Sequence, residues 1–292
     1  MMDDARTRIG IIGGSGLYEM EGLRNVREVR LDTPFGAPSD AYVLGEIDGE
    51  RVAFLPRHGR GHRIAPTELN SRANIFGFKT LGVERLIAVS AVGSMREEIH
   101  PLDIVIPDQL IDRTRQRANT FFGEGIVAHV GIADPFCSDL SAILARAADG
   151  RGVTVHPRGT YVCIEGPQFS TRAESRVFQS WGASVIGMTA LPEARLAREA
   201  EICYAMLALA TDYDVWHESE EAVTVEMVVA NLLRNVDRAR HALRVAIGGA
   251  SAPRRCMCGD ALRDAIMTRA DLIPAERRTA LAPLIGRYVV QS

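Results

Sequence analysis

Apolar runs of strand length alternate with segments of helical spacing along the 292 residues. Helices are expected over residues 69–81, 138–149 and 224–247, with two more that begin near Thr171 and just before Pro192. Residues 109–122 are polar and are expected to form a loop. Strands are expected at residues 8–12, 41–55 (a hairpin turning at Asp48-Gly49), 85–92, 103–107, 160–164, 184–188 and 204–210.

The alternation continues without an internal repeat, a low-complexity tract or a clear linker. We therefore predict a single α/β domain over residues 1–292, with a helical tail from about residue 248.

The buried run at residues 204–210 ends in Thr211-Asp212-Tyr213-Asp214. Ligands of open α/β sheets bind beyond the carboxyl ends of the strands. Two carboxylates at such a place are costly to bury unless they have a partner, such as a hydrogen-bond donor on a bound ligand. A solvated Asp-rich turn explains the same residues equally well, so this segment alone does not decide.

Glycines and hydroxyls follow the first strand as Gly13-Gly14-Ser15-Gly16. Neither the dinucleotide fingerprint nor the P-loop pattern is completed, which leaves a small anion cradle or a plain tight turn. The predicted hairpin leads into PRHGRGHR, with Arg57 and His58 directly after the strand. An anion site is favoured here over a solvated basic loop, because glycines allow the backbone to approach closely and Arg fits phosphate oxygens.

Further candidates lie at other strand ends. Ser90 and Ala91 precede a Gly-Ser pair, and Thr189 stands where a helix begins, as an anion ligand or an N-cap. Phe169 could stack on a planar ring, although a lone Phe is more often core. For His129 a structural role is favoured from the residues alone. The first turns of the long helix carry three valines that are either core or an apolar subsite: Val225, Val228 and Val229.

Composition narrows the class of protein. A hydrophobic content of 47% is ordinary for a soluble globular protein, and a net charge of −3 gives no basic surface for nucleic acid. The polar N-terminus resembles no signal peptide, and no run is long enough to span a membrane, so the expected location is the cytoplasm.

Five cysteines without a secretion signal argue against a disulfide framework. Cys163 and Cys203 are expected to be small core residues. Cys256 and Cys258 form a C-x-C pair, but a zinc site needs a second pair, and none is well spaced in the sequence. Plain thiols are favoured, with a redox or regulatory role left open, and no metal site is predicted.

Taken together, the segments resemble the trimeric purine nucleoside phosphorylases. The matching stretches run in family order over most of residues 8–247, and the match weakens after about residue 248. They are IGIIGGSGL, FLPRHGRGH, AVGSMREEI, IADPFC, EGPQFSTRAESRVFQSWGASVIGMT, LPEARLAREAEICYA and ATDYDVW. The resemblance implies a twisted, mixed and partly barrel-like β-sheet flanked by helices, and phosphorolysis of a purine nucleoside.

The resemblance also assigns roles to residues. It places Phe169 beside the base, Met188 at the ribose, and Ser170, Asp212 and Asp214 in base recognition. It implies a homotrimer in which His129 reaches the active site of a neighbouring subunit, phosphate as co-substrate, and no metal or organic cofactor. The implied phosphate ligands are Ser15, Arg57, His58, Ser90, Ala91 and Thr189.

Within this resemblance, chemistry favours a 6-aminopurine. A carboxylate at Asp214 accepts from a 6-amino group and repels a 6-oxo group, and Asp212, if protonated, suits N7 of the departing base. No Asn lies between Asp212 and Glu221 to serve a 6-oxopurine. The valines at residues 225–229 favour a 5′-methylthio group over a hydroxyl, which would lose its partners there.

Other interpretations remain at this stage. The same fold could act on a 5′-methylthio nucleoside of a 6-oxopurine (methylthioinosine) or on purine nucleosides in general. A non-catalytic nucleotide-binding protein is a remote alternative. Hydrolysis is disfavoured because water needs no phosphate site. A Rossmann oxidoreductase is disfavoured by the broken glycine pattern.

Overall fold

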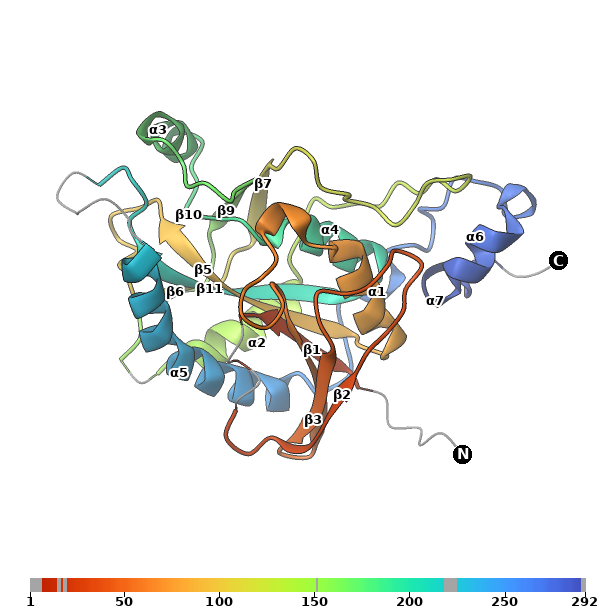
Figure 1. Cartoon of the computed structure of the whole chain (residues 1–292), viewed down its shortest axis with the longest axis horizontal. Helices are drawn as coiled ribbons and strands as arrows, with labels where there is room; N and C mark the ends of the chain where they lie inside the picture. The colour runs from red at the N-terminus through yellow and green to blue at the C-terminus, as the bar shows by residue number, and fades with distance from the viewer. Residues whose placement is uncertain (1–6, 15–16, 18–19, 151, 218–224, 290–292) are drawn as a thin grey trace.

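The computed structural model describes residues 7–14, 17, 20–150, 152–217 and 225–289. Two parallel strands form the centre of the fold (Figure 1). They are β5 (Arg85–Ser94) and β11 (Cys203–Asp212), paired in register from Cys203 opposite Arg85 to Ala210 opposite Val92. All ten residues of β11 are buried. The uninterrupted apolar run is therefore that of a strand covered on both faces.

The described strands form one mixed sheet in the order β2-β3-β4-β1-β5-β10-β9-β7, and β11, β6 and β8 join it through β5. β5 branches: its first part lies between β1 and β11, whereas Gly93 and Ser94 pair antiparallel with β10. The remaining strands are β1 (Ile9–Gly13), β2 (Arg24–Val29), β3 (Tyr42–Ile47), β4 (Glu50–Pro56), β6 (Ile104–Val105), β7 (Gln109–Arg113), β8 (Val155–His156), β9 (Thr160–Ile164) and β10 (Val185–Gly187).

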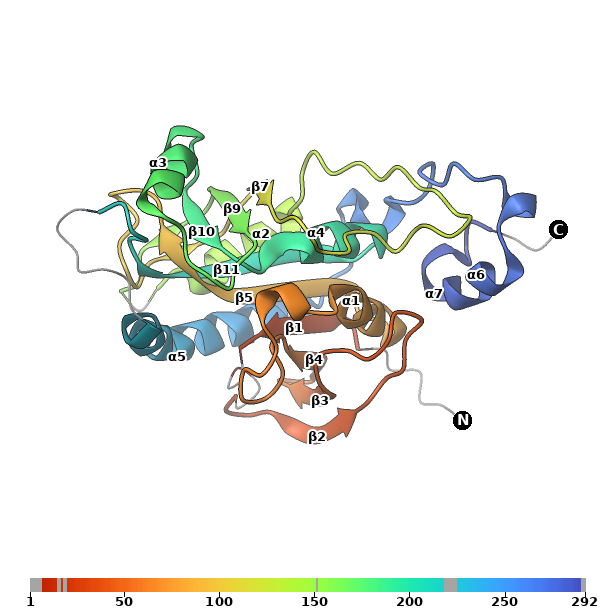
Figure 2. The same ribbon diagram turned by 45° about the horizontal axis from the view of Figure 1, so that its top comes forward.

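Helices cover both faces of this sheet (Figure 2). On one face Leu140 and Leu144 of α2 and Leu243 of α5 pack against β1 and β11. On the other, the core contains Phe78 of α1 and Leu196 of α4. The described helices are α1 (Ser71–Thr80), α2 (Ser138–Ala148), α3 (Arg172–Ser180), α4 (Ala190–Glu199), α5 (Val225–Gly249), α6 (Ala275–Ala280) and α7 (Ala282–Ile285), with 3₁₀ turns η1 (Pro66–Glu68), η2 (Met257–Asp260) and η3 (Ala270–Leu272).

The main strands and helices expected from the sequence are confirmed, including the hairpin that turns at Asp48-Gly49. The expectation of a loop over 109–122 was wrong at its start, because residues 109–113 form β7, parallel to β9. β2 was not predicted at all: five of its six residues are exposed, so they carry little apolar signal.

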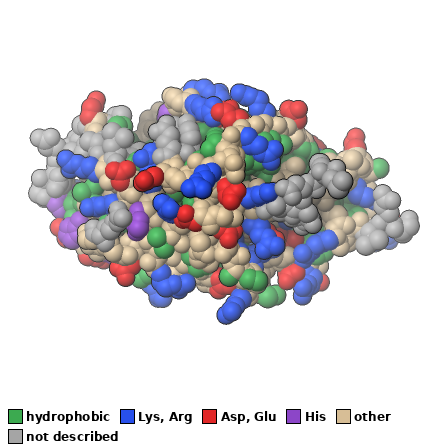
Figure 3. Space-filling model, turned by 90° about the horizontal axis from the view of Figure 1, so that it is seen from below, with side chains coloured by type: hydrophobic (Ala, Val, Ile, Leu, Met, Phe, Trp, Pro, Cys, Tyr) green, Lys and Arg blue, Asp and Glu red, His purple; other side chains and the backbone are tan. Residues whose placement is uncertain are grey.

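The surface agrees with the modest net charge. On the face seen in Figure 3, basic and acidic side chains are interspersed rather than gathered by sign. Among the helices that the structure describes, none combines the length and apolarity needed to cross a membrane.

Candidate active site

Asp212 and Asp214 lie where β11 leaves the sheet, and they are only 7% and 8% exposed. Asp212 accepts hydrogen bonds from the Thr211 hydroxyl at 2.7 Å and from the Asp214 backbone N–H at 2.8 Å. Asp214, at φ 54°, accepts from the Ser175 hydroxyl at 2.7 Å. Of the two sequence interpretations, the structure excludes the solvated turn, because both carboxylates are buried.

A glycine on the neighbouring strand makes room for this pair. A Cβ at Gly93 of β5 would lie 3.0 Å from Asp212 Oδ1, 3.3 Å from Asp214 Cβ and 2.9 Å from Ile186. Only a residue without a side chain lets the strand approach the carboxylates this closely.

Burial raises the pKa of both carboxyl groups above the ordinary value, although the hydroxyl and backbone donors act in the opposite direction. The neighbouring charge of Asp212 also raises the pKa of Asp214. A raised pKa makes a proton available on the pair, as acid catalysis at a leaving base requires.

The segment between β9 and α3 opens onto a cavity of about 820 Å³, whose lining includes residues of α3. Phe169 and Ser170 line it, and Phe169 is 46% exposed. The Ser170 hydroxyl oxygen is buried without a hydrogen-bond partner among the described residues. An unpartnered buried hydroxyl is costly, so it is suited to a polar ligand atom. Ser175 of α3 joins this wall to Asp214.

The hydroxyl of Ser90, within β5, meets the hydroxyl of Thr189, which follows β10. The Thr189 hydroxyl donates to Ser90 Oγ at 2.9 Å, and Ser90 donates to the Ala91 carbonyl at 3.1 Å. Thr189 is the residue before α4, yet its side chain does not cap the helix. Thr189 therefore occupies the N-cap position without a capping bond from its side chain, and its hydroxyl lies with Ser90 at a helix N-terminus, where anions are favoured.

Arg57 is the largest buried polar side chain of this region, at 2% exposure. Its Nε lies 2.6 Å from Oε1 of Glu193 and its Nη2 lies 3.1 Å from Oε2. Further bonds go to the carbonyls of Val89 (2.9 Å) and Ile12 (3.3 Å). The Tyr204 hydroxyl donates to Glu193 at 2.9 Å. Arg57 is thus held rigidly at the ends of β1 and β5, and its charge is already paired within the protein.

His58 follows Arg57 and is also buried. Its Nδ1 lies 2.8 Å from the Ile64 carbonyl, which requires a proton on Nδ1 and leaves Nε2 as the second polar atom. Burial, with the Arg57 charge, lowers the pKa of His58 to about 4. The neutral form therefore prevails in the free protein at neutral pH.

Met188 is held by Arg117, a contact that the sequence did not indicate. Arg117 donates to the Met188 and Leu191 carbonyls at 2.6 Å each and to the Glu165 carbonyl at 2.5 Å. A Cβ on Gly166 (φ +68°) would lie 2.5 Å from Met188 Sδ. Arg117, Glu193 and Ser175 were missed because their partners lie 39 to 136 residues away in the chain.

Not every predicted site residue joins this arrangement. Ser15 lies outside the described residues, as do the side chains of Val225 and Val228. Val229 lies on α5 and is 47% exposed. α5 itself is tied to the end of β11, where Asn231 donates to the Thr211 carbonyl at 2.6 Å.

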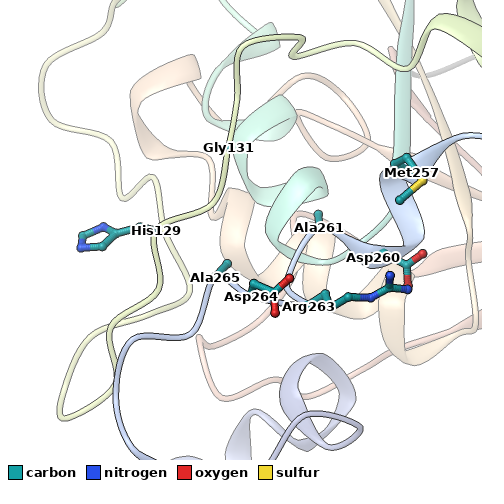
Figure 4. Close-up of a pocket in the computed structure, with 8 residues that line it drawn as sticks. All are labelled: His129, Gly131, Met257, Asp260, Ala261, Arg263, Asp264 and Ala265. Carbon is teal, nitrogen blue, oxygen red and sulfur yellow. The ribbon is translucent and has the colours of Figure 1, made fainter.

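His129 belongs to the loop between β7 and α2, and this loop runs beside the C-terminal segment (Figures 1 and 2). Its backbone N–H donates to the Ala265 carbonyl at 2.8 Å. It lines a separate cavity of about 330 Å³ together with Asp260 and Arg263, and its ring is directed away from the other labelled side chains (Figure 4).

Comparisons with known proteins bear on this site. The family model of the phosphorylase superfamily matches residues 8–247. The chain is 61% identical to an S-methyl-5′-thioadenosine phosphorylase of Geobacter sulfurreducens, over 96% of this chain and 99% of that protein. A methylthioadenosine phosphorylase from an antarctic soil metagenomic library superposes with a TM-score of 0.92 at 51% identity, covering 96% and 99%. The methylthioadenosine phosphorylase of Schistosoma mansoni in complex with adenine gives a TM-score of 0.82 at 37% identity, covering 88% and 96%.

Proposed function

Because the chain belongs to the phosphorylase superfamily and, within it, to the S-methyl-5′-thioadenosine phosphorylases, we propose that the residues around β5 and β11 catalyse the phosphorolysis of S-methyl-5′-thioadenosine as follows. The enzyme uses phosphate to cleave the glycosidic bond of S-methyl-5′-thioadenosine, and it releases adenine and 5-methylthioribose 1-phosphate. One observation supports the assignment of roles above all. One strand, β5, carries both groups: Ser90 bonds to Thr189, and about 10 Å further along the strand Gly93 packs against Asp212 and Asp214.

At the phosphate end we assign Arg57, His58, Ser90, Ala91 and Thr189 as ligands, with Ser15 from the segment outside the described residues. The hydroxyls of Ser90 and Thr189 face each other and can rotate to donate to phosphate oxygens. Neutral His58 can take up a proton at Nε2 when the anion arrives, because a bound phosphate favours the imidazolium form.

At the base end Asp214 accepts from the 6-amino group of adenine, and Ser170 supplies a further polar contact. Asp212 carries the proton that N7 takes as the bond to C1′ breaks, so it is the catalytic residue in this scheme. Its raised pKa supports that role, because the protonated form must be present at the moment of departure. Phosphate then attacks C1′ of a transition state with oxocarbenium character.

Met188 contacts the ribose and Phe169 covers the base in this scheme. Val225, Val228 and Val229 at the start of α5 form the apolar surface for the 5′-methylthio group. His129, which lines a separate cavity of its own chain, reaches the site of a neighbour in a homotrimer. Mixed trimers that combine His129→Ala chains with Asp212→Asn chains test that assignment: activity above that of either variant alone supports it, and full activity of the all-His129→Ala trimer refutes it.

We propose further that the enzyme is cytoplasmic and that its reaction uses phosphate as co-substrate without an organic cofactor or metal in the active site. The reaction itself requires neither, because positioning and proton donation suffice for loss of the base.

Adenine release from S-methyl-5′-thioadenosine, measured with and without phosphate beside the inosine counterpart, is the experiment that tests the scheme. Phosphate-dependent release with a higher kcat/KM for the adenosine compound supports the roles of Asp212 and Asp214. A higher kcat/KM for the inosine compound would overturn the account of Asp214. Release without phosphate would overturn the assignment of the anion ligands.

A further inference from the structure

Four of the five cysteines converge at a place that plays no part in the reaction above. Their Sγ atoms all lie within 4.8 Å of one another, and those of Cys203 and Cys256 are 3.3 Å apart. Cys137 immediately precedes α2, Cys203 begins β11, and Cys256 and Cys258 flank Met257 at η2. The sequence did not indicate this cluster because its three segments are separated by 66 and 53 residues (Cys137 to Cys203, and Cys203 to Cys256).

The spacing of the sulfur atoms fits four ligands around one ion. A Zn–S bond of about 2.3 Å in a tetrahedron places the sulfur atoms about 3.8 Å apart. A disulfide would instead bring two of them to about 2.05 Å, and all five cysteines are free. We infer that Cys137, Cys203, Cys256 and Cys258 form a tetrahedral Zn²⁺ site, which replaces the expectation of plain thiols and no metal.

The surroundings suit a cluster that gains negative charge. Binding removes one proton from each thiol, so Zn²⁺ with four thiolates carries a net charge of −2. Nη1 of Arg198 lies 3.7 Å from Cys258 Sγ and offsets part of this charge.

Burial indicates a structural rather than a catalytic ion. Cys137, Cys203 and Cys258 are at most 5% exposed, whereas Cys256 is half-buried and offers an entry path. Four protein ligands leave no open position for water or substrate. Cys203 and Asp212 are nine residues apart on one strand, so the ion would lie about 30 Å from the catalytic carboxylate. Its effect is to fasten the segment after α5 to β11 and α2.

Metal content of the full-length protein tests the site. The wild type, grown with zinc and purified with reductant and without chelator, should contain about one zinc per chain by mass spectrometry. The double variant Cys256→Ser/Cys258→Ser should lose it. Cys163→Ser is the matched control, because Cys163 is buried on β9, outside the cluster, and should retain the metal. Removal of zinc from the wild type should lower the Tm while Cys163→Ser behaves like the wild type.

A second measurement on the wild type decides the matter even if the double variant does not fold. Reconstitution with Co²⁺ should give the intense visible bands of tetrahedral cobalt and a thiolate-to-cobalt charge-transfer band. Absence of these bands, or of zinc after dialysis against excess Zn²⁺ with reductant, overturns the proposal. It is equally overturned by iron in place of zinc, or by a single free thiol in denaturant without reductant, which would mean two disulfides.

Discussion

The buried pair of Arg57 and Glu193 allows a sharp test of how the phosphate end is held together. Both side chains are 2% exposed, and the carboxylate accepts two bonds from the guanidinium and one from Tyr204. Glu193→Gln keeps the shape of the side chain but leaves the buried arginine without a counter-charge. Removal of one partner of a buried ion pair costs about 3 kcal/mol at the lower end of measured values. For a chain of this length that corresponds to a fall in Tm of about 5 °C.

Phosphate sharpens this test, because a bound anion gives Arg57 a new partner. Thermal unfolding in phosphate-free buffer and in saturating phosphate should therefore show a larger phosphate-induced rise in Tm for Glu193→Gln than for the wild type. Glu199→Gln, on the same helix, is the matched control. Glu199 is 8% exposed but does not contact Arg57, and its replacement should not lower the Tm at pH 7.5. Equal Tm values and equal phosphate shifts for Glu193→Gln and the wild type would refute the reasoning.

Three further predictions concern the carboxylates. Asp214→Asn should lower kcat/KM for S-methyl-5′-thioadenosine by about 10- to 100-fold and raise it for the inosine counterpart, since the amide can donate to a 6-oxo group; unchanged selectivity would contradict the role of Asp214. Gly93→Ala should lower kcat at least about tenfold and also lower the Tm, because its Cβ would lie 3.0 Å from Asp212 Oδ1 and 2.9 Å from Ile186, so that both must shift; steady-state kinetics and thermal unfolding check this together. Burial raises the pKa of Glu199 to about 7 from its ordinary 4.5, so its contribution to stability is present below pH 4.5 and is lost as the pH rises through 7. The free energy of unfolding should fall by about 3 kcal/mol more over that range in the wild type than in Glu199→Gln, as urea titrations at several pH values would reveal.

The sequence predicted those parts of the fold whose signal is local. β5 and β11 are apolar throughout and are buried on both faces, so their composition alone reveals them. β2 and β7 were missed because their residues are largely exposed or half-buried and polar, and only pairing with β3 and β9 makes them strands.

The same limit applies to the site. Asp212, Asp214, Ser90 and Thr189 stand at strand ends, where position along the chain suffices to indicate a ligand. Partners that depend on long-range packing could not be foreseen: Glu193 for Arg57, Ser175 for Asp214, and Cys137 for the C-x-C pair. Nothing in the local sequence around a buried charge says which distant residue neutralises it.

The pairing of Arg57 with Glu193 has a consequence for the electrostatics of bond breaking. The guanidinium and the carboxylate cancel, and His58 is neutral, so these three groups contribute no net charge before phosphate binds. Of the two charges of a dianion that enters beside them, the proton taken up by His58 offsets one, and the anion keeps the rest of its own field. That field would be directed at the ribosyl carbon as it becomes cationic, so the nucleophile would itself stabilise the charge that forms beside it.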